Sequence, residues 1–254
     1  MFAAVDARVK APFLIVETGQ PVRSMRRYGG FPHWIRVAAG LEAGETVVAN
    51  VERGDALPGR EGFAGVIVSG SAAMVTDRAD WSERSAEWLR EAAHEGLPLL
   101  GICYGHQLLA HALGGEVAHH PEGVEIGTVR VQRHAAAQTD PLLGALPDEF
   151  DVQATHWQSV RRLPPGAVLL AGNAHEPHHA FRVGPNAWGV QFHPEFSAEA
   201  LKAYLDGLGP TLASEGRDAA QITSQLKDTP EAASVLPRFA RLALDNQRNT
   251  HRRD

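Results

Sequence analysis

Residues 97–110 read Leu-Pro-Leu-Leu-Gly-Ile-Cys-Tyr-Gly-His-Gln-Leu-Leu-Ala, and this stretch decides the fold. Its first six residues are a short apolar run, which predicts a buried strand, and the leucines near its end begin a spacing that fits a helix packed on a sheet. Cys103 lies at the turn between the two. Gly101 and Gly105 flank it, which indicates a strained turn that larger side chains would prevent. The sequence therefore predicts a strand, a tight turn and a helix.

Cys103 is the one cysteine of the chain, so an intrachain disulfide and a cysteine-rich zinc site are excluded. A single cysteine beside Leu and Ile is most often a buried core residue. The glycines on both sides and the position at a strand-to-helix turn favour a nucleophile instead. The helix that follows would direct its free N–H groups and the positive end of its dipole at the sulfur, which stabilises the thiolate.

Short apolar runs alternate with helical patterns in the first half of the chain. The predicted strands are 13–16, 46–51 and 63–68, and the predicted helices are 32–39 and 81–94. Alternation of this kind is typical of βαβ units on a parallel sheet. We therefore expect an α/β fold, a three-layer sandwich with a mostly parallel, flavodoxin-like central sheet and an active site at the carboxyl ends of the strands.

Strand-like segments replace this alternation in the second half of the chain. They are separated by turn residues and comprise 128–132, 150–155, 167–171, 180–183 and 188–192. We expect them to form β hairpins added to the parallel core. From Ala198 onward the composition is mostly helical. No Pro-, Gly- or Ser-rich linker divides the sequence, and we expect one domain over residues 1–210 followed by a helical extension over 211–254.

Composition and charge narrow the classes of function. A net charge of -6 and a pI of ≈ 6.1 give no electrostatic reason to bind nucleic acid or an anionic membrane surface. No run of about 18 apolar residues is present, and Asp6, Arg8 and Lys10 interrupt the start of the chain, where a signal peptide would be apolar. We therefore expect a cytoplasmic protein whose partners are small molecules or other proteins.

Further motifs accompany the cysteine turn in a fixed order along the chain. They are Val66-Ile-Val-Ser-Gly-Ser71 followed by Asp77 and Trp81, Gly114-Gly-Glu-Val117, Gly123-Val-Glu-Ile-Gly127, and Gly189-Val-Gln-Phe-His-Pro-Glu195. Together with Gly101-Ile-Cys-Tyr-Gly-His-Gln107, they resemble the class I glutamine amidotransferases over roughly residues 12–205. The cysteine motif is similar to that of the amidotransferase domain of GMP synthetase and of its stand-alone relatives.

The resemblance implies a catalytic triad of Cys103, His193 and Glu195. A cysteine nucleophile needs a base that takes its proton and protonates the leaving amine, and this base needs a partner that fixes its tautomer. His193 and Glu195 match the family's base and acid, and Pro194 between them predicts a bend that turns both side chains toward one site. The reaction implied is hydrolysis of the γ-amide of glutamine through a thioester, without a metal or an organic cofactor.

The same resemblance implies oxyanion and substrate contacts. Backbone N–H groups of Tyr104 and of the loop at Gly70 and Ser71 are expected to receive the oxyanion of the tetrahedral intermediates. Without the resemblance, Ser-Gly-Ser reads equally well as an ordinary strand-ending turn. The residues expected to contact the substrate are Gln107, His156, Trp157 and Gln158. The family often has an acidic residue at the position of Gln158.

A second motif suggests a different class of hydrolase. His175-Glu-Pro-His-His179 formally matches the His-Glu-x-x-His pattern of zinc peptidases. That pattern works when a helix places both histidines on one face, one turn apart. Pro177 lies within the five residues and both flanks are strand-like, so we expect no zinc site here.

The fate of the ammonia divides the possible functions. The sequence contains no phosphate-binding loop of the Ser-Gly-Gly-x-Asp-Ser or Walker kind, so we do not expect this chain alone to be a complete GMP synthetase. It either supplies ammonia to a separate acceptor or synthetase subunit, or acts alone on glutamine or on γ-glutamyl peptides and amides. A third alternative is a catalytically silent binding module, although the cysteine, the histidine and the glutamate are all present.

Overall fold

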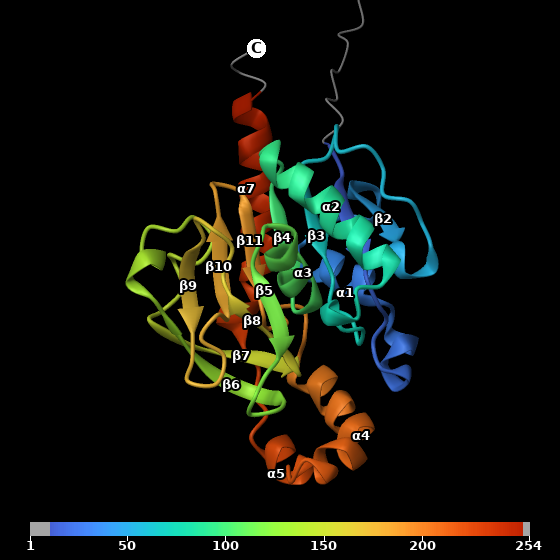
Figure 1. The fold of residues 1–254 in the computed structure, drawn as a ribbon, viewed down its shortest axis with the longest axis vertical. Helices are drawn as coiled ribbons and strands as arrows, with labels where there is room; N and C mark the ends of the chain where they lie inside the picture. Colours follow the sequence, from blue (N-terminus) through green and yellow to red (C-terminus); the bar gives the residue numbers. More distant parts are fainter. Residues whose placement is uncertain (1–10, 251–254) are drawn as a thin grey trace, which may run out of the picture.

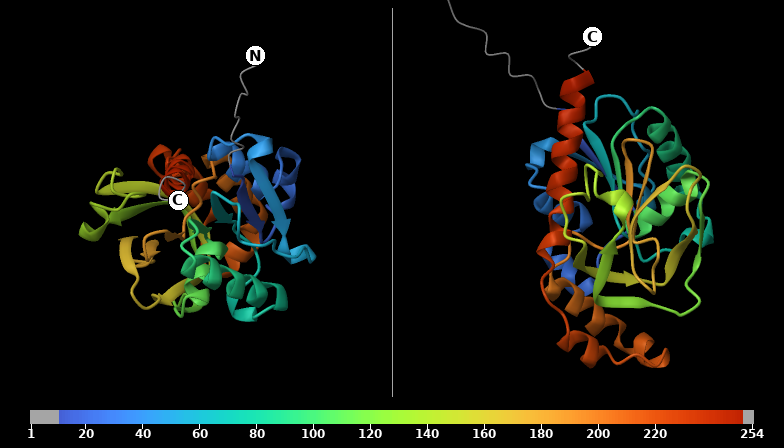
Figure 2. Two further views of the ribbon diagram at one scale, coloured as in Figure 1. Left: turned by 90° about the horizontal axis from the view of Figure 1, so that it is seen from above. Right: turned by 90° about the vertical axis from the view of Figure 1, so that its left-hand side faces the viewer.

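A computed structural model of the protein describes residues 11–250. The charged residues near the start of the chain, Asp6, Arg8 and Lys10, and the last four residues of the predicted extension, 251–254, lie outside the described residues. A nine-stranded sheet runs through the centre and helices cover both of its faces, as Figures 1 and 2 show. The predicted α/β three-layer fold is confirmed.

The parallel half of the sheet has the spatial order β2-β1-β3-β4-β11. Its strands are β1 (Phe13–Glu17), β2 (Thr46–Asn50), β3 (Gly65–Val68), β4 (Leu99–Ile102) and β11 (Ala187–Val190). Every residue of β3, β4 and β11 is buried. Because helices cover both faces, these strands are continuous apolar runs and not alternating ones, which is why the sequence identified them.

The other half of the sheet continues antiparallel from β11, in the order β10-β9-β6-β7. These strands are β10 (Ala180–Val183), β9 (Val168–Gly172), β6 (Glu125–Arg133) and β7 (Glu149–His156). The predicted hairpins are therefore part of the main sheet. A separate two-stranded sheet joins β5 (Glu116–His119) to β8 (Gln158–Arg162). The sequence did not predict β5, because its four residues are partly exposed and show no apolar alternation.

The helices divide between the two faces of the sheet. The bounds are α1 (Phe31–Ala38), α2 (Asp80–His94), α3 (Tyr104–Ala112), α4 (Ala198–Ser214), α5 (Ala219–Ser224), α6 (Pro230–Ala233) and α7 (Val235–Thr250). In the right-hand view of Figure 2, the sheet lies between α7 on one side and α2 with α3 on the other. Helices α4 and α5 lie at the lower end of the molecule in Figure 1. None of the helices within residues 11–250 is long and apolar enough to span a membrane.

Helix α7 packs against the sheet through one aromatic residue. Phe239 is fully buried, and its ring lies edge-on to Phe13 of β1 at 6.5 Å and to Trp188 of β11 at 6.2 Å between centroids. The C-terminal part of the chain therefore completes one of the two hydrophobic cores. Helix α4 runs across position 210, and the division of the chain into a domain over 1–210 and an extension over 211–254 stays a prediction.

We predict that Phe239→Ala destabilises the fold by about 3–5 kcal/mol, because it removes a buried ring between two strands and leaves a cavity. Urea unfolding followed by circular dichroism measures this change. The exposed neighbour Arg241 provides the matched control, and Arg241→Ala should change stability by less than about 0.5 kcal/mol. Equal stability of the two variants would show that α7 does not anchor on the sheet.

Candidate active site

Cys103 lies at the turn between β4 and α3 in a backbone conformation that L-residues rarely adopt, with φ 51 and ψ -101. A Cβ at position 101 would overlap the carbonyl oxygen of Gly105, and a Cβ at position 105 would lie 2.5 Å from the carbonyl oxygen of Val68. Both glycines are therefore required by direct backbone contact. The predicted strand, tight turn and helix are present, and the turn holds the sulfur at the start of α3.

The sheet brings His193 to the cysteine. Strands β4 and β11 are parallel neighbours, with Ile102 opposite Val190, so the residues that follow each strand emerge at the same edge. The Cys103 backbone N–H donates to the carbonyl of Val190 at 2.9 Å. The His193 backbone N–H donates to the Gln153 carbonyl of β7 at 2.9 Å, which fixes the segment after β11 across the end of the sheet.

His193 and Glu195 form a buried pair. Nδ1 of His193 lies 2.8 Å from Oε1 of Glu195, and both side chains are almost inaccessible to solvent. The Cys103 side chain lies close enough to act on the charge of the imidazole. Burial lowers the pKa of His193, but the Glu195 carboxylate and the Cys103 sulfur outweigh it and raise the pKa to about 10. The ring of Phe196 stacks on the imidazole at 4.1 Å and fixes its plane.

The loop after β3 borders the same three side chains. A Cβ at position 70 would lie 2.8 Å from Cε1 of His193 and 3.8 Å from Cβ of Cys103, so Gly70 lets the backbone come close to the site. Thr18 holds the loop, because its hydroxyl donates to the carbonyls of Ser69 and Gly70 at 2.9 and 3.1 Å. Ser71 and Tyr104 both line the cavity in front of the cysteine. The structure thus places the predicted oxyanion donors beside Cys103, and their role stays a prediction.

Gln107 and Gln158, expected to contact the substrate, are held by the protein. Nε2 of Gln107 donates to the Gln158 carbonyl at 2.7 Å and to Oε1 of Gln191 at 3.0 Å, which uses both amide hydrogens. Oε1 of Gln158 accepts from the Val75 N–H at 3.1 Å, and its Nε2 donates to the hydroxyl of Thr76 at 2.5 Å. Both glutamines line the cavity, but their polar atoms also join the two sides of its wall.

His156 belongs to a buried polar network that the sequence did not reveal. Its Nε2 lies 2.9 Å from Oε2 of Glu125, and its Nδ1 lies 3.0 Å from the Gln158 carbonyl. Both ring nitrogens therefore have partners within the protein, although the residue also lines the cavity. Glu125 also contacts His179 at 3.0 Å and Asn173 at 2.8 Å. Burial raises the pKa of Glu125, but the hydrogen bonds from His156 and His179 outweigh it and lower the pKa well below its usual value.

Trp157 lies at the mouth of the cavity, and its indole Nε1 donates to Glu215 at the end of α4 at 2.9 Å.

The only sequence signal for Glu125 was its place in the motif Gly123-Val-Glu-Ile-Gly127, to which no role had been given. No local pattern indicates Asn173, because the contacts of this network join residues far apart along the chain.

The segment His175–His179 forms a turn between β9 and β10 and not a helix. Two of its histidines are held elsewhere, since His179 contacts Glu125 and the ring of His175 stacks on His120 with 4.0 Å between centroids. The helical spacing that a His-Glu-x-x-His zinc site requires is therefore absent here. Across residues 11–250, no group of three or more His, Cys, Asp or Glu side chains is arranged to hold a metal ion.

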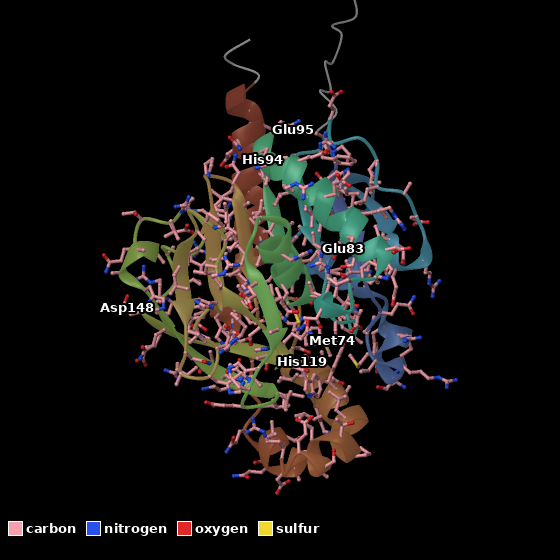
Figure 3. The ribbon with its side chains drawn as sticks, in the orientation of Figure 1. Met74, Glu83, His94, Glu95, His119 and Asp148 are labelled. Carbon is pink, nitrogen blue, oxygen red and sulfur yellow. The ribbon has the colours of Figure 1, made fainter. Side chains whose placement is uncertain are left out.

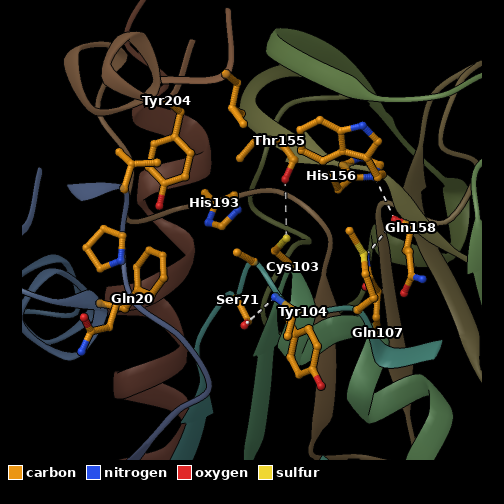
Figure 4. Close-up of a pocket in the computed structure, with 18 of the residues that line it drawn as sticks. Gln20, Ser71, Cys103, Tyr104, Gln107, Thr155, His156, Gln158, His193 and Tyr204 are labelled. Atoms are coloured by element: carbon orange, nitrogen blue, oxygen red, sulfur yellow. Dashed lines mark hydrogen bonds between the residues drawn. The ribbon is translucent and has the colours of Figure 1, made fainter. Parts of the chain in front are cut away.

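A cavity of ≈ 330 Å³ opens in front of Cys103. In Figure 4 the sulfur lies at its centre, with Gln107 and Gln158 on one side and Tyr204 and Gln20 on the other. The thiol points at the Thr155 carbonyl, 3.8 Å away. Met74, which also lines the cavity, is labelled in Figure 3 toward the lower end of the sheet. The site therefore lies at the carboxyl ends of β3 and β4, where a parallel sheet places its ligands.

Three comparisons with known proteins agree with this geometry. Residues 33–206 match the family "Glutamine amidotransferase class-I". A glutamine-hydrolysing GMP synthase from Thermomicrobium roseum is 41% identical over 141 residues, which is 56% of this chain and 25% of that protein. Gamma-glutamyl peptidase 4 from Arabidopsis thaliana is 28% identical over 148 residues, covering 58% of this chain and 59% of the peptidase.

Among solved structures, a glutamine amidotransferase from Thermotoga maritima superimposes with a TM-score of 0.72 at 18% identity, covering 92% of this chain and 99% of that one. At this identity the likeness shows the fold. The chain spans only 25% of the length of the GMP synthase that it matches. Because the family match covers most of the chain, this protein belongs to the class I glutamine amidotransferases. Members of this family are glutamine-hydrolysing enzymes.

We predict that Glu195→Gln removes a pH-dependent part of the stability. The pKa of His193 is raised to about 10, above the ordinary value of about 6.5 for histidine. The stabilisation is therefore complete below about pH 6.5 and declines as the pH rises toward 10. The melting temperature should differ most between wild type and Glu195→Gln near pH 6, and the difference should shrink toward pH 10. A difference that stays constant or grows with pH would contradict the assigned pair.

Proposed function

We propose that this protein hydrolyses the γ-amide of glutamine through a γ-glutamyl thioester on Cys103 and releases glutamate and ammonia for a separate acceptor. The observation that carries this proposal is the strained turn that presents Cys103 to the buried pair of His193 and Glu195. The family assignment supports the same reaction.

In the first half of the reaction, the Cys103 sulfur attacks the carbonyl carbon of the side-chain amide. The thiol proton passes to His193, which gives it to the departing nitrogen, so a C–S bond forms as the C–N bond breaks and ammonia leaves. Glu195 holds the imidazole in orientation and stabilises its charged form. The N–H of Tyr104 and the loop at Gly70 and Ser71 would bind the oxyanion of the intermediate.

In the second half, a water molecule occupies the place that ammonia has left and acts as the nucleophile. His193 takes a proton from a water molecule, whose oxygen attacks the thioester carbon, and the C–S bond breaks to release glutamate and restore the thiol. Water supplies the attacking electron pair of this half, and His193 returns the proton that it takes from water to the Cys103 sulfur.

The acceptor of the ammonia is the second part of the proposal. Residues of this chain match only the amidotransferase-sized part of a glutamine-hydrolysing GMP synthase. We therefore favour a separate synthetase subunit as the partner, in the cytoplasm. Mixing the purified chain with candidate ATP-dependent synthetases and measuring ammonia transfer tests this part.

A stand-alone γ-glutamyl peptide or amide hydrolase is the alternative function. The observation that favours it is the size of the cavity, which extends past Cys103 on the side of Tyr204. The similarity to gamma-glutamyl peptidase 4 points in the same direction. Both functions use the same thioester and differ in the amine that leaves. A catalytically silent module is the remaining alternative, and the intact geometry of the three side chains gives it no support.

We predict that Cys103→Ala abolishes the release of glutamate from glutamine or from a γ-glutamyl amide, because no thioester can form. Coupled assays of glutamate and ammonia measure the loss, and mass spectrometry of the quenched wild-type enzyme should show the acyl adduct. Activity that survives in Cys103→Ala would overturn the thioester mechanism.

We also predict that Gly70→Ala lowers turnover about 100-fold, because the added methyl group pushes His193 out of line with the sulfur. Because Gly70 is buried against His193, the melting temperature is measured beside turnover, to separate a loss of folding from a loss of catalysis. Gly59→Ala, at an exposed position with nothing within 4 Å of the added methyl group, is the matched control. Normal turnover in Gly70→Ala would show that the loop does not border the reacting atoms.

A further inference from the structure

The side of the cavity beside His193 receives the leaving amine. His193 must protonate the departing nitrogen, so that nitrogen lies next to its ring. Phe196 stacks on His193 at 4.1 Å, and Tyr204 of α4 lies against Phe196 at 5.0 Å between ring centroids. Tyr204 therefore bounds the space into which the amine departs, and Figure 4 shows its hydroxyl directed into that space, away from Gln107.

The Tyr204 hydroxyl is a buried donor without an acceptor. Its oxygen is inaccessible to solvent, and the Val22 backbone acts on it as a donor, but no acceptor for the hydroxyl proton is present within residues 11–250. Burial and the negative charge of Glu195 raise the pKa of Tyr204, so the hydroxyl keeps its proton over the physiological range. A buried hydroxyl of this kind costs stability unless a partner satisfies it. A bound ligand with an acceptor on this side would supply that partner.

Arg26 adds a positive charge to the cavity that Tyr204 borders. Both residues line it, and helix α4, which carries Tyr204, packs against the turn Arg23–Tyr28, which carries Arg26. Its Nε donates to the Pro21 carbonyl at 2.9 Å, which orients the guanidinium, while its terminal nitrogens form no ion pair in the described part of the chain. Neither Asp nor Glu is among the residues within 11–250 that line the cavity. The charge on this side therefore suits an anion.

The wall between these groups is apolar. Val22, Phe31 and Leu208 line the cavity on the same side as Tyr204. Ammonia would leave most of this space unfilled and would not use a buried hydroxyl donor or a guanidinium. An amine with a short hydrocarbon part and a carboxylate would fill the wall and pair with both polar groups.

We propose that Tyr204 and Arg26 form a carboxylate subsite for the leaving amine, and that the protein cleaves γ-glutamyl amides of amino acids in preference to amides of neutral amines. This inference rests on the thioester mechanism proposed above, and it specifies the substrate class of the alternative function, the γ-glutamyl peptide or amide hydrolase. The C–N bond that breaks is the γ-amide bond, and the amino acid leaves with the proton from His193 in place of ammonia.

The test compares substrates that differ only in the carboxylate. The pairs are γ-glutamylglycine with γ-glutamylmethylamide, and γ-glutamylleucine with γ-glutamyl-isopentylamide, with glutamine as the reference. Wild type should favour the carboxylate member by roughly tenfold or more in kcat/KM, as expected for a charge-assisted hydrogen bond. Tyr204→Phe and Arg26→Gln should each remove most of this preference, measured as the ratio of kcat/KM within each pair.

Two controls separate recognition from packing. Arg26→Lys should restore part of the preference, and Arg23→Gln, on the same exposed turn but outside the cavity lining, should leave it unchanged. If Tyr204→Phe lowers turnover of every substrate equally, or leaves the ratio within each pair unchanged, Tyr204 only supports Phe196 and the subsite is wrong.

Binding to Cys103→Ala, measured by calorimetry, gives a readout that needs no turnover. γ-Glutamylglycine should bind more tightly than γ-glutamylmethylamide, and Tyr204→Phe in the same background should equalise them. Hydrolysis without carboxylate preference would overturn the subsite and leave the proposed function standing. Preferential binding of γ-glutamylglycine without hydrolysis of any substrate would support the subsite and overturn the proposed function. The absence of both preferential binding and hydrolysis would overturn the subsite and the proposed function together.

Discussion

The contact of backbone with backbone between helix α3 and the sheet is the constraint on which the rest of the site depends. Gly101 meets the Gly105 carbonyl, and Gly105 meets the Val68 carbonyl, so α3 starts closer to β3 and β4 than any side chain would allow. This close approach forces Cys103 into its positive φ and points its sulfur out of the sheet. The strain stored there is held by packing on both sides of the turn, since β3, β4 and α3 are all buried.

The pairing of β4 with β11 turns this local strain into a reactive group. Because the two strands are parallel neighbours in register, the residues that follow them reach the same edge, and His193 arrives beside Cys103 although ninety positions separate them in the sequence. The imidazole is then fixed from three directions, by the Glu195 carboxylate, by the ring of Phe196 and by its own backbone bond to β7. Burial in this setting strengthens each charge interaction.

Much of this arrangement could be predicted from the sequence, where short local patterns mark the buried strands and the cysteine turn. Buried parallel strands are apolar runs, and the cysteine turn requires glycines, so β4 and the position of Cys103 were readable locally. The joining of β9, β10 and β11 into the main sheet was not, because strand order depends on long-range pairing. Likewise, no local pattern indicates that Glu125 binds His156 and His179. No local pattern singles out Tyr204 among the residues of its helix either.

Helix α4 borders the site through Tyr204 and Leu208 in the middle of its length, and Glu215, which follows its last residue, accepts a hydrogen bond from the Trp157 indole. The bond-breaking groups, in contrast, lie on strand ends in the centre of the sheet. The proposed amine subsite and the proposed catalytic groups are therefore encoded in separate stretches of the gene. On this proposal, substitutions along one helix change what is cleaved while the strained turn stays intact, which gives an evolutionary route by which chains of this fold diverge in substrate and keep the thiol reaction.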